Sequence, residues 1–446
     1  MPRAPLRDDI AVRRYLQRHI EPGLPPCSAG AGPWQHVVVV PAYRESSELV
    51  ARLAQLPPGH GRTLVTLVIN RPHTDTNAAA NDTLREALRE LPRAPGYHPD
   101  CALHRASAQT DIAVLDLDSQ RGPLPAREGV GLARKIGFDL ALLWMQAGKI
   151  FDDWICSTDA DATLPPCYFT QLAGAPEGAV GATFPFTHES CHDTALSAAG
   201  SLYELRLHYY VCGLEYARSP YAWHSLGSCL AVRKSAYAHV RGWPRRAAAE
   251  DFYLLNKLTK LGDIARLQGA CIKLATRASD RVPFGTGPAV STMALAATPD
   301  AARVFEHPMA FEALRVFLRV LPGLRPEHGC DVQRQLLSGG LPEPLAREAA
   351  RTLENLKFAR ALEHCREYSK DTQSFRQHFN QWFDAFRTLR FLRELARAGW
   401  ENIALDELDS LQPSLWPEHI AGDPDALRRA LMQHWDWDPL AGYGPA

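Results

Sequence analysis

Two aspartates separated by a single residue, Asp159 and Asp161, are the side chains of this sequence best suited to chemistry. They follow the apolar pair Trp154-Ile155, which is typical of a buried strand. In an extended chain residues i and i+2 lie on the same side, so the two carboxylates can converge where the strand ends. Paired carboxylate oxygens suit Mg²⁺ or Mn²⁺ carrying a diphosphate, although short acidic pairs also occur in solvated turns. The pair therefore predicts a metal-dependent enzyme acting on a nucleotide-linked substrate.

The sequence around this pair alternates between predicted strands and predicted helices, and these elements must position the two carboxylates. Apolar or β-branched runs predict strands, whereas longer amphipathic stretches predict helices. The predicted strands are 36–40, 64–70, 112–117 and 154–157. One predicted helix begins near 46, and two others cover 81–91 and 129–147. Short joints connect them, which favours an α/β fold with a mostly parallel, Rossmann-like sheet flanked by helices.

Polar or turn-forming residues follow three of these predicted strands. Pro41-Ala42-Tyr43, Asn70 and the Asp159 turn each come directly after a strand. Open parallel sheets bind ligands beyond the carboxyl ends of their strands, so these three loops should line one crevice. No G-x-G-x-x-G follows the first strand, which disfavours a redox dinucleotide-binding domain.

The composition is that of a folded globular protein. The 446 residues are 46% hydrophobic, and 49 basic against 50 acidic side chains give a formal net charge of −1. Such a balance gives no reason to expect binding to nucleic acid. The ten cysteines include no C-x-x-C pair, which is typical of reduced cysteines in a cytoplasmic protein.

Three segments are expected along the chain. Residues 1–33 form an N-terminal extension, 34–295 the α/β domain, and 296–446 a helical C-terminal region rich in Leu, Ala, Arg and Glu. No window approaches eighteen uninterrupted apolar residues, so no transmembrane segment is expected. Peripheral membrane contact and the oligomeric state stay open.

Six motifs occur in a fixed order along the chain. They are Val37-Val38-Val39-Val40-Pro41-Ala42-Tyr43-Arg44-Glu45, Gly129-Val130-Gly131-Leu132-Ala133-Arg134-Lys135, Asp159-Ala160-Asp161, Gly227-Ser228-Cys229-Leu230-Ala231-Val232-Arg233, Gly242-Trp243 and Ala249-Glu250-Asp251-Phe252. Each motif is common alone, but the ordered set is specific. It resembles the family 2 glycosyltransferases with the GT-A fold, and the resemblance covers about residues 35–290.

The resemblance implies residues that bind the nucleotide of a sugar donor. The first strand end would hold base and ribose through Pro41, Ala42, Tyr43 and Glu45. Family members often place an aspartate where this chain has Asn70, and an amide can still donate and accept hydrogen bonds.

Near the start of its predicted helix, Arg134 could reach the diphosphate, or it could be a surface arginine. The resemblance further implies that Asp161 binds the metal through the diphosphate and that Asp159 leans toward ribose or metal. By the same resemblance Asp251 is the base that deprotonates the acceptor hydroxyl, and Glu250 beside it binds the acceptor or orients the loop. Helix N-terminal capping is the alternative explanation for Glu250-Asp251.

Further residues are candidates for sugar and acceptor binding. Gly227-Ser228 would bring backbone close to the sugar, and Trp243 would offer an aromatic face or belong to the core. Arg277 and Arg281 lie in a basic, glycine-bearing loop suited to phosphates or an anionic acceptor. The chain lacks the Gln-x-x-Arg-Trp signature of processive synthases, so a single sugar transfer is expected.

The expected activity is inverting, metal-dependent transfer from a nucleotide-diphosphate sugar, in particular a UDP-sugar, to an unidentified acceptor hydroxyl. A retaining enzyme that resembles the glucosyl-phosphoglycerate synthases is one alternative. A non-catalytic protein that binds nucleotide sugars or carbohydrate is another. The sequence does not distinguish the donor sugar or the acceptor.

Overall fold

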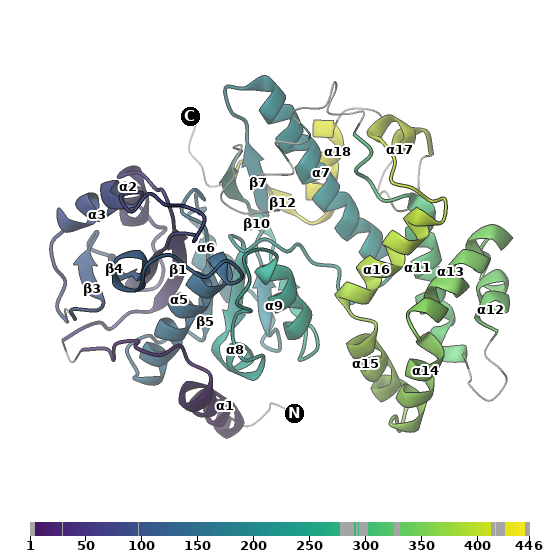
Figure 1. The fold of residues 1–446 in the computed structure, drawn as a ribbon, viewed down its shortest axis with the longest axis horizontal. Coiled ribbons are helices and arrows are strands. Elements are labelled where there is room, and N and C mark those ends of the chain that lie inside the picture. Colours follow the sequence, from purple (N-terminus) through teal and green to yellow (C-terminus); the bar gives the residue numbers. More distant parts are fainter. Residues whose placement is uncertain are drawn as a thin grey trace. The chain divides into compact units, whose positions relative to one another are not determined.

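The chain folds as two compact units in the computed structural model (Figure 1). The structure describes residues 5–28, 30–96, 98–276, 302–324, 331–411 and 424–441, together with residues 290, 293 and 415. Unit 1 comprises Met1–Cys191, Ser225–Pro288 and Asp436–Ala446, and unit 2 comprises His192–His224 and Ala289–Trp435. The N-terminal extension thus belongs to the same compact unit as the α/β core, whereas residues 192–224 belong to the other.

An eight-stranded sheet forms the centre of unit 1 within the described residues, with strand order β3-β4-β2-β1-β5-β8-β6-β9. The strands are β1 (His36–Ala42), β2 (Thr63–Ile69), β3 (Ala102–Arg105), β4 (Thr110–Asp116), β5 (Trp154–Ser157), β6 (Gly181–Thr183), β8 (Leu230–Arg233) and β9 (Ile264–Arg266). Strands β4, β2, β1 and β5 run parallel, with Val38 opposite both Val65 and Cys156. Strands β3 and β8 pair antiparallel with their neighbours β4 and β5. The predicted α/β class with a mostly parallel sheet is confirmed.

The helices of unit 1 flank this sheet. They are α1 (Pro5–Arg18), α2 (Glu48–Ala54), α3 (Asp82–Arg89), α4 (Leu117–Arg121), α5 (Gly129–Gln146), α6 (Tyr168–Ala173), α8 (Lys234–His239) and α9 (Glu250–Leu258). Helix α5 lies against β1 and β2, where a Cβ on Gly137 would clash with Val39. A glycine at this point therefore allows the close approach of helix and sheet. Two short pairs complete the unit, β7 (Phe186–Glu189) with β11 (Ile272–Ala275) and β10 (Gly269–Ala270) with β12 (Trp437–Asp438).

Unit 2 is helical in its described residues, so the predicted helical C-terminal region is also confirmed. Its elements are α7 (Thr194–Tyr216), α11 (Pro308–Val320), the 3₁₀ turn η2 (Leu321–Gly323), α12 (Val332–Ser338), α13 (Glu343–Asn355), α14 (Phe358–Glu367), α15 (Thr372–Trp382), α16 (Ala385–Arg397), α17 (Leu405–Leu411) and α18 (Pro424–His434). Phe317 on α11 contacts the rings of Phe358, Phe383 and Phe391, which come from successive parts of the helical array. These aromatic contacts give the unit its own apolar core.

Candidate active site

Arg134 on helix α5 joins three polar side chains from distant parts of the sequence. Its guanidinium donates from Nη2 to Asp159 Oδ1 at 2.6 Å, from Nη1 to Ser157 Oγ at 2.6 Å and from Nε to Glu250 Oε1 at 3.1 Å. The Arg134 side chain is only 4% exposed. Burial opposes its charge, but the Asp159 and Glu250 carboxylates outweigh that effect and raise the pKa of Arg134. Arg134 therefore stays a cation and holds two motifs together.

Two glycines fix the position of this guanidinium. A Cβ on Gly227 would lie 2.5 Å from Arg134 Nη2, so the backbone of the Gly227-Ser228 motif rests directly on the cation. At the start of α5, the Gly131 amide donates to the Arg246 carbonyl at 3.0 Å. A Cβ on Gly131 would lie 2.6 Å from that same oxygen. The loop before α9 thus lies so close to α5 that Glu250, at its end, is within hydrogen-bond distance of Arg134.

The aspartate pair occupies a turn directly after β5, as its spacing predicts. The Asp159 carbonyl accepts from the Ala162 amide at 3.2 Å, which closes the turn. The Asp159 side chain is 41% exposed although one oxygen is bound to Arg134, and Asp161 is half-buried. In the described part of the chain, no group of three or more His, Cys, Asp or Glu side chains is arranged to hold a metal ion. A cation here would therefore need phosphate or water oxygens in addition to the two carboxylates, which is the usual mode for Mg²⁺.

Glu250 and Asp251 form the first turn of α9, directly after Ala249 in the left-handed conformation with φ 56°. Glu250 is 5% exposed, and burial raises its pKa against the opposing charge of Arg134. Burial, with the neighbouring Glu250 charge, raises the pKa of Asp251 to about 7. A carboxyl group with such a pKa exchanges a proton near neutral pH, as a general base must.

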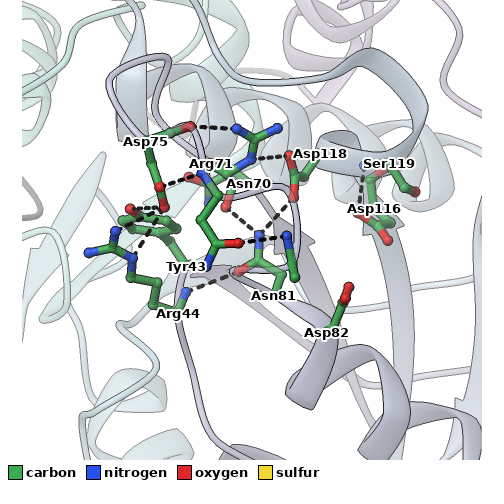
Figure 2. Close-up of polar contacts among 12 residues, drawn as sticks. Tyr43, Arg44, Asn70, Arg71, Asp75, Asn81, Asp82, Asp116, Asp118 and Ser119 are labelled. Atoms are coloured by element: carbon green, nitrogen blue, oxygen red, sulfur yellow. Dashed lines mark hydrogen bonds and ion pairs between the residues drawn. The ribbon is translucent and has the colours of Figure 1, made fainter.

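A second polar network lies at the ends of β1, β2 and β4 (Figure 2). The Tyr43 hydroxyl donates to Asp75 Oδ2 at 2.6 Å, and Arg44 Nη2 lies 3.0 Å from the same oxygen. These partners lower the pKa of Asp75, the Tyr43 hydrogen bond having the largest effect. Tyr43, a predicted nucleotide contact, thus has its hydroxyl directed at the loop after β2.

Asn81 connects the three strand ends, and sequence reasoning missed this role. Its Nδ2 donates to the Asn70 carbonyl at 3.0 Å and to Asp118 Oδ2 at 3.1 Å, while its Oδ1 accepts from the Arg44 amide at 3.0 Å (Figure 2). Asp118 also binds Arg71 Nε at 2.7 Å. A signal was present, because Asp116 and Asp118 repeat the one-residue spacing of the pair at 159 and 161.

The remaining predicted residues are distributed as follows. Pro41 and Ala42 are buried at the end of β1, Glu45 is half-buried, and Ser228 is 4% exposed. Trp243 is 1% exposed and packs edge-on against Phe138, which favours the core role over the sugar-facing one. Arg277 and Arg281 lie outside the described residues. The structure therefore brings together Arg134, Asp159, Gly227 and Glu250, and their functional roles stay predictions.

The similarity of this chain to known proteins is one of structure and not of sequence. No protein-family model matches the sequence, and no curated protein matches it. Among solved structures, the chain is similar to S. aureus TarS 1-349 in complex with UDP-GlcNAc, with TM-score 0.34 and 13% identity over 90% of this chain and 89% of that one. It is also similar to the mannosyltransferase PcManGT from Pyrobaculum calidifontis in complex with GDP-Man and Mn²⁺, with TM-score 0.32 and 15% identity over 89% and 95%. Likenesses at this level carry no conclusion about function.

No helix in the described ranges combines enough length with enough apolar character to span a membrane.

Proposed function

We propose that this chain is a glycosyltransferase that moves a sugar from a nucleotide-diphosphate donor to an acceptor hydroxyl with inversion at the anomeric carbon. The observation that carries the proposal is the buried Arg134 cation, which binds Asp159 and Glu250 at once. Arg134 thereby holds two groups on one framework. The exposed Asp159 carboxylate suits a diphosphate-bound cation, and the Glu250-Asp251 pair suits proton transfer. The ordered motifs around them support the same activity.

The donor base would bind at the ends of β1 and β2. Asn70 Nδ2 donates to the Ala42 and Val68 carbonyls at 3.1 and 3.2 Å, which directs Oδ1 away from them. Since a carbonyl oxygen can only accept, it would receive a ring N–H from the base. Uracil and guanine carry such a ring N–H, whereas cytosine and adenine have a bare ring nitrogen there and could reach the oxygen only through their exocyclic amines. Asn70 therefore supports a UDP- or GDP-sugar, and the resemblance favours UDP.

Asp161 and the oxygen of Asp159 not bonded to Arg134 would hold a divalent cation. All their donor atoms are carboxylate oxygens on one tight turn, which fits the preference of Mg²⁺ and Mn²⁺. When bound, such a cation neutralises charge on the leaving diphosphate. Arg134 does not need to reach the phosphates for this, because its hydrogen bonds to Ser157 and Asp159 fix the Asp159 carboxylate instead.

Asp251 would act as the general base. As the acceptor oxygen attacks the anomeric carbon, its proton passes to the Asp251 carboxylate, and the bond between the anomeric carbon and the diphosphate oxygen breaks with its electron pair on the diphosphate. Burial and the Glu250 charge give Asp251 a pKa of about 7, so near neutral pH it is basic enough to accept the proton. Glu250, fixed by Arg134, sets the position of its neighbour.

A thermal-shift screen of UDP-, GDP-, CDP- and ADP-sugars with and without Mn²⁺ tests the proposal. A ligand that binds only the native state raises the melting temperature by an amount set by its concentration relative to Kd. We expect UDP- or GDP-sugars to stabilise the protein and Mn²⁺ to increase the shift. NMR of the product should then reveal the anomer opposite to that of the donor. No stabilisation by any nucleotide sugar would contradict the proposal, and an unchanged anomer would contradict the inverting mechanism.

A further inference from the structure

A second buried charge cluster lies on helix α5 one residue beyond Arg134. Lys135 Nζ donates to Asp139 Oδ2 at 2.6 Å and to the Tyr15 hydroxyl at 2.8 Å. The Tyr15 and Tyr237 hydroxyls both donate to Asp139 Oδ1, at 2.6 and 2.7 Å. Asp139 is 0% and Tyr15 is 1% exposed. Helix α1 of the N-terminal segment is therefore bonded through buried polar groups to the helix that carries Arg134.

The same N-terminal segment contacts the loop 242–249, which leads into helix α9. Glu21 Oε1 accepts from Arg245 Nη2 at 2.6 Å, and Glu21 is 5% exposed. Gly242, with φ 76°, lies so close to Tyr15 that a Cβ there would clash with the tyrosine hydroxyl. Two residues of the N-terminal segment thus touch the beginning and the middle of the loop.

The far end of the loop is held by helix α5. The Gly131 amide donates to the Arg246 carbonyl at 3.0 Å, and the loop ends at Glu250, which accepts from Arg134 Nε at 3.1 Å. The first helical N–H groups have no partner within their own helix, so the Gly131 amide depends on this loop for its hydrogen bond. Exchange of that amide with solvent therefore reports whether the loop is in place.

We propose that Tyr15 on helix α1 and Glu21, which follows this helix, are positioning residues that fix the loop 242–249 and hence the location of Glu250 and Asp251. The catalytic part of this proposal rests on the proposed function above, but the structural part, that Tyr15 and Glu21 fix the loop, does not. The N-terminal segment acts as one side of a clamp on the loop, and the start of α5 acts as the other.

The alternative is that this cluster only stabilises the fold. Buried ion pairs often contribute little net stability relative to apolar residues, because desolvation opposes their attraction. The two explanations differ in what a conservative substitution changes. A clamp predicts a local loss of order in the loop and a fall in kcat, whereas general stabilisation predicts a lower melting temperature with both properties unchanged in the native state.

The test uses two variants of the full chain that keep the size of the side chain. Tyr15→Phe removes the hydroxyl that bonds to Asp139 and Lys135, and Glu21→Gln removes the negative charge that faces Arg245. Hydrogen exchange by NMR should show the Gly131 amide exchanging about tenfold faster or more in both variants. Trypsin should also cut faster after Arg245 and Arg246. Steady-state kinetics should show kcat falling by about tenfold while the Kd of the donor stays the same.

Tyr221→Phe is the matched control, since it removes a buried tyrosine hydroxyl that donates to the Asn380 carbonyl at 2.6 Å in unit 2. It should leave Gly131 exchange and kcat unchanged. The clamp is refuted if exchange of the Gly131 amide is unchanged in both variants, or if the control accelerates it equally. If the wild-type chain transfers no sugar, the proposed function fails while exchange still decides the clamp.

Discussion

Replacing Asp251 by asparagine should remove catalysis and at the same time stabilise the protein above neutral pH. The carboxyl pKa is raised from 3.8 to about 7, first by burial and then by the charge of Glu250. Below 3.8 the group is protonated in both the folded and the unfolded state, so it does not affect stability. Above 7 it is ionised in both, and the folded state bears the full penalty. The free energy of unfolding therefore falls as pH rises from 4 to 7.

The size of the effect follows from the same values. Each pKa unit corresponds to about 1.4 kcal/mol, so the difference between 3.8 and about 7 sets an upper limit of about 4 kcal/mol. Asparagine cannot ionise, so Asp251→Asn should exceed the wild type by up to that amount at pH 8 and match it near pH 4. Loss of the proton acceptor should lower kcat by about 10²-fold or more with donor binding preserved.

Urea unfolding at pH 4.5 and pH 8, with EDTA present to remove cations, measures the stability, and nucleotide release measures the turnover. Asp153→Asn is the control, because Asp153 is a 53% exposed carboxylate beside Lys234 and should change neither property. If Asp251→Asn is no more stable than the wild type at pH 8, or if its advantage is equal at both pH values, the raised pKa of Asp251 is refuted.

Three further predictions concern the framework of the site. Arg134→Lys keeps a charge but cannot reach three acceptors, so it should lower the free energy of unfolding by about 3 kcal/mol in urea titrations and abolish transfer. Gly131→Ala should displace the backbone of Arg246, lower stability by about 1–3 kcal/mol and slow kcat, whereas Gly178→Ala, where a Cβ meets nothing within 4 Å, should match the wild type in both assays. Asp161→Asn should lose the Mn²⁺-dependent thermal shift, measured relative to the variant's own melting temperature without Mn²⁺, and an unchanged Mn²⁺ response would contradict the metal site.

The elements of the sheet could be predicted because their signals are local. The β-branched run at 37–40 and the apolar run at 64–69 are buried on both faces of parallel strands, which is the pattern that periodicity detects. Strand β3 escaped prediction because its four residues are only partly buried and include His104 and Arg105. A short antiparallel edge strand of this kind has no distinctive pattern in a single sequence.

The candidate site could be predicted in its residue types but not in its contacts. The sequence indicates that Arg134 lies early in a helix, yet its partner Glu250 is 116 residues further along the chain. Only the close approach of Gly131 to the loop 242–249 brings them together, and spacing along the chain does not encode that distance. For the same reason the Asp116-x-Asp118 pair could not be told from Asp159-x-Asp161. Arginines from other elements neutralise the first pair, whereas a side chain of the second stays exposed.

Arg134 and Lys135 are neighbours on α5, and their adjacency explains how one helix serves both clusters. Successive residues of an α-helix point about 100° apart, so the two cations leave the helix in different directions. Arg134 binds Glu250 at the end of the loop 242–249, while Lys135 binds Tyr15, which contacts the beginning of the loop. Burial of two cations on one helix opposes stability unless each is fully paired, and apolar residues could fill the same volume. Arg134 bonds to Glu250 at the end of the loop, and Lys135 bonds to Tyr15, which contacts its beginning, so the charges are best understood as fixing its geometry. A loop held at its beginning by the N-terminal segment and at its end by α5 keeps a base such as Asp251 in place without relying on contacts from the substrate.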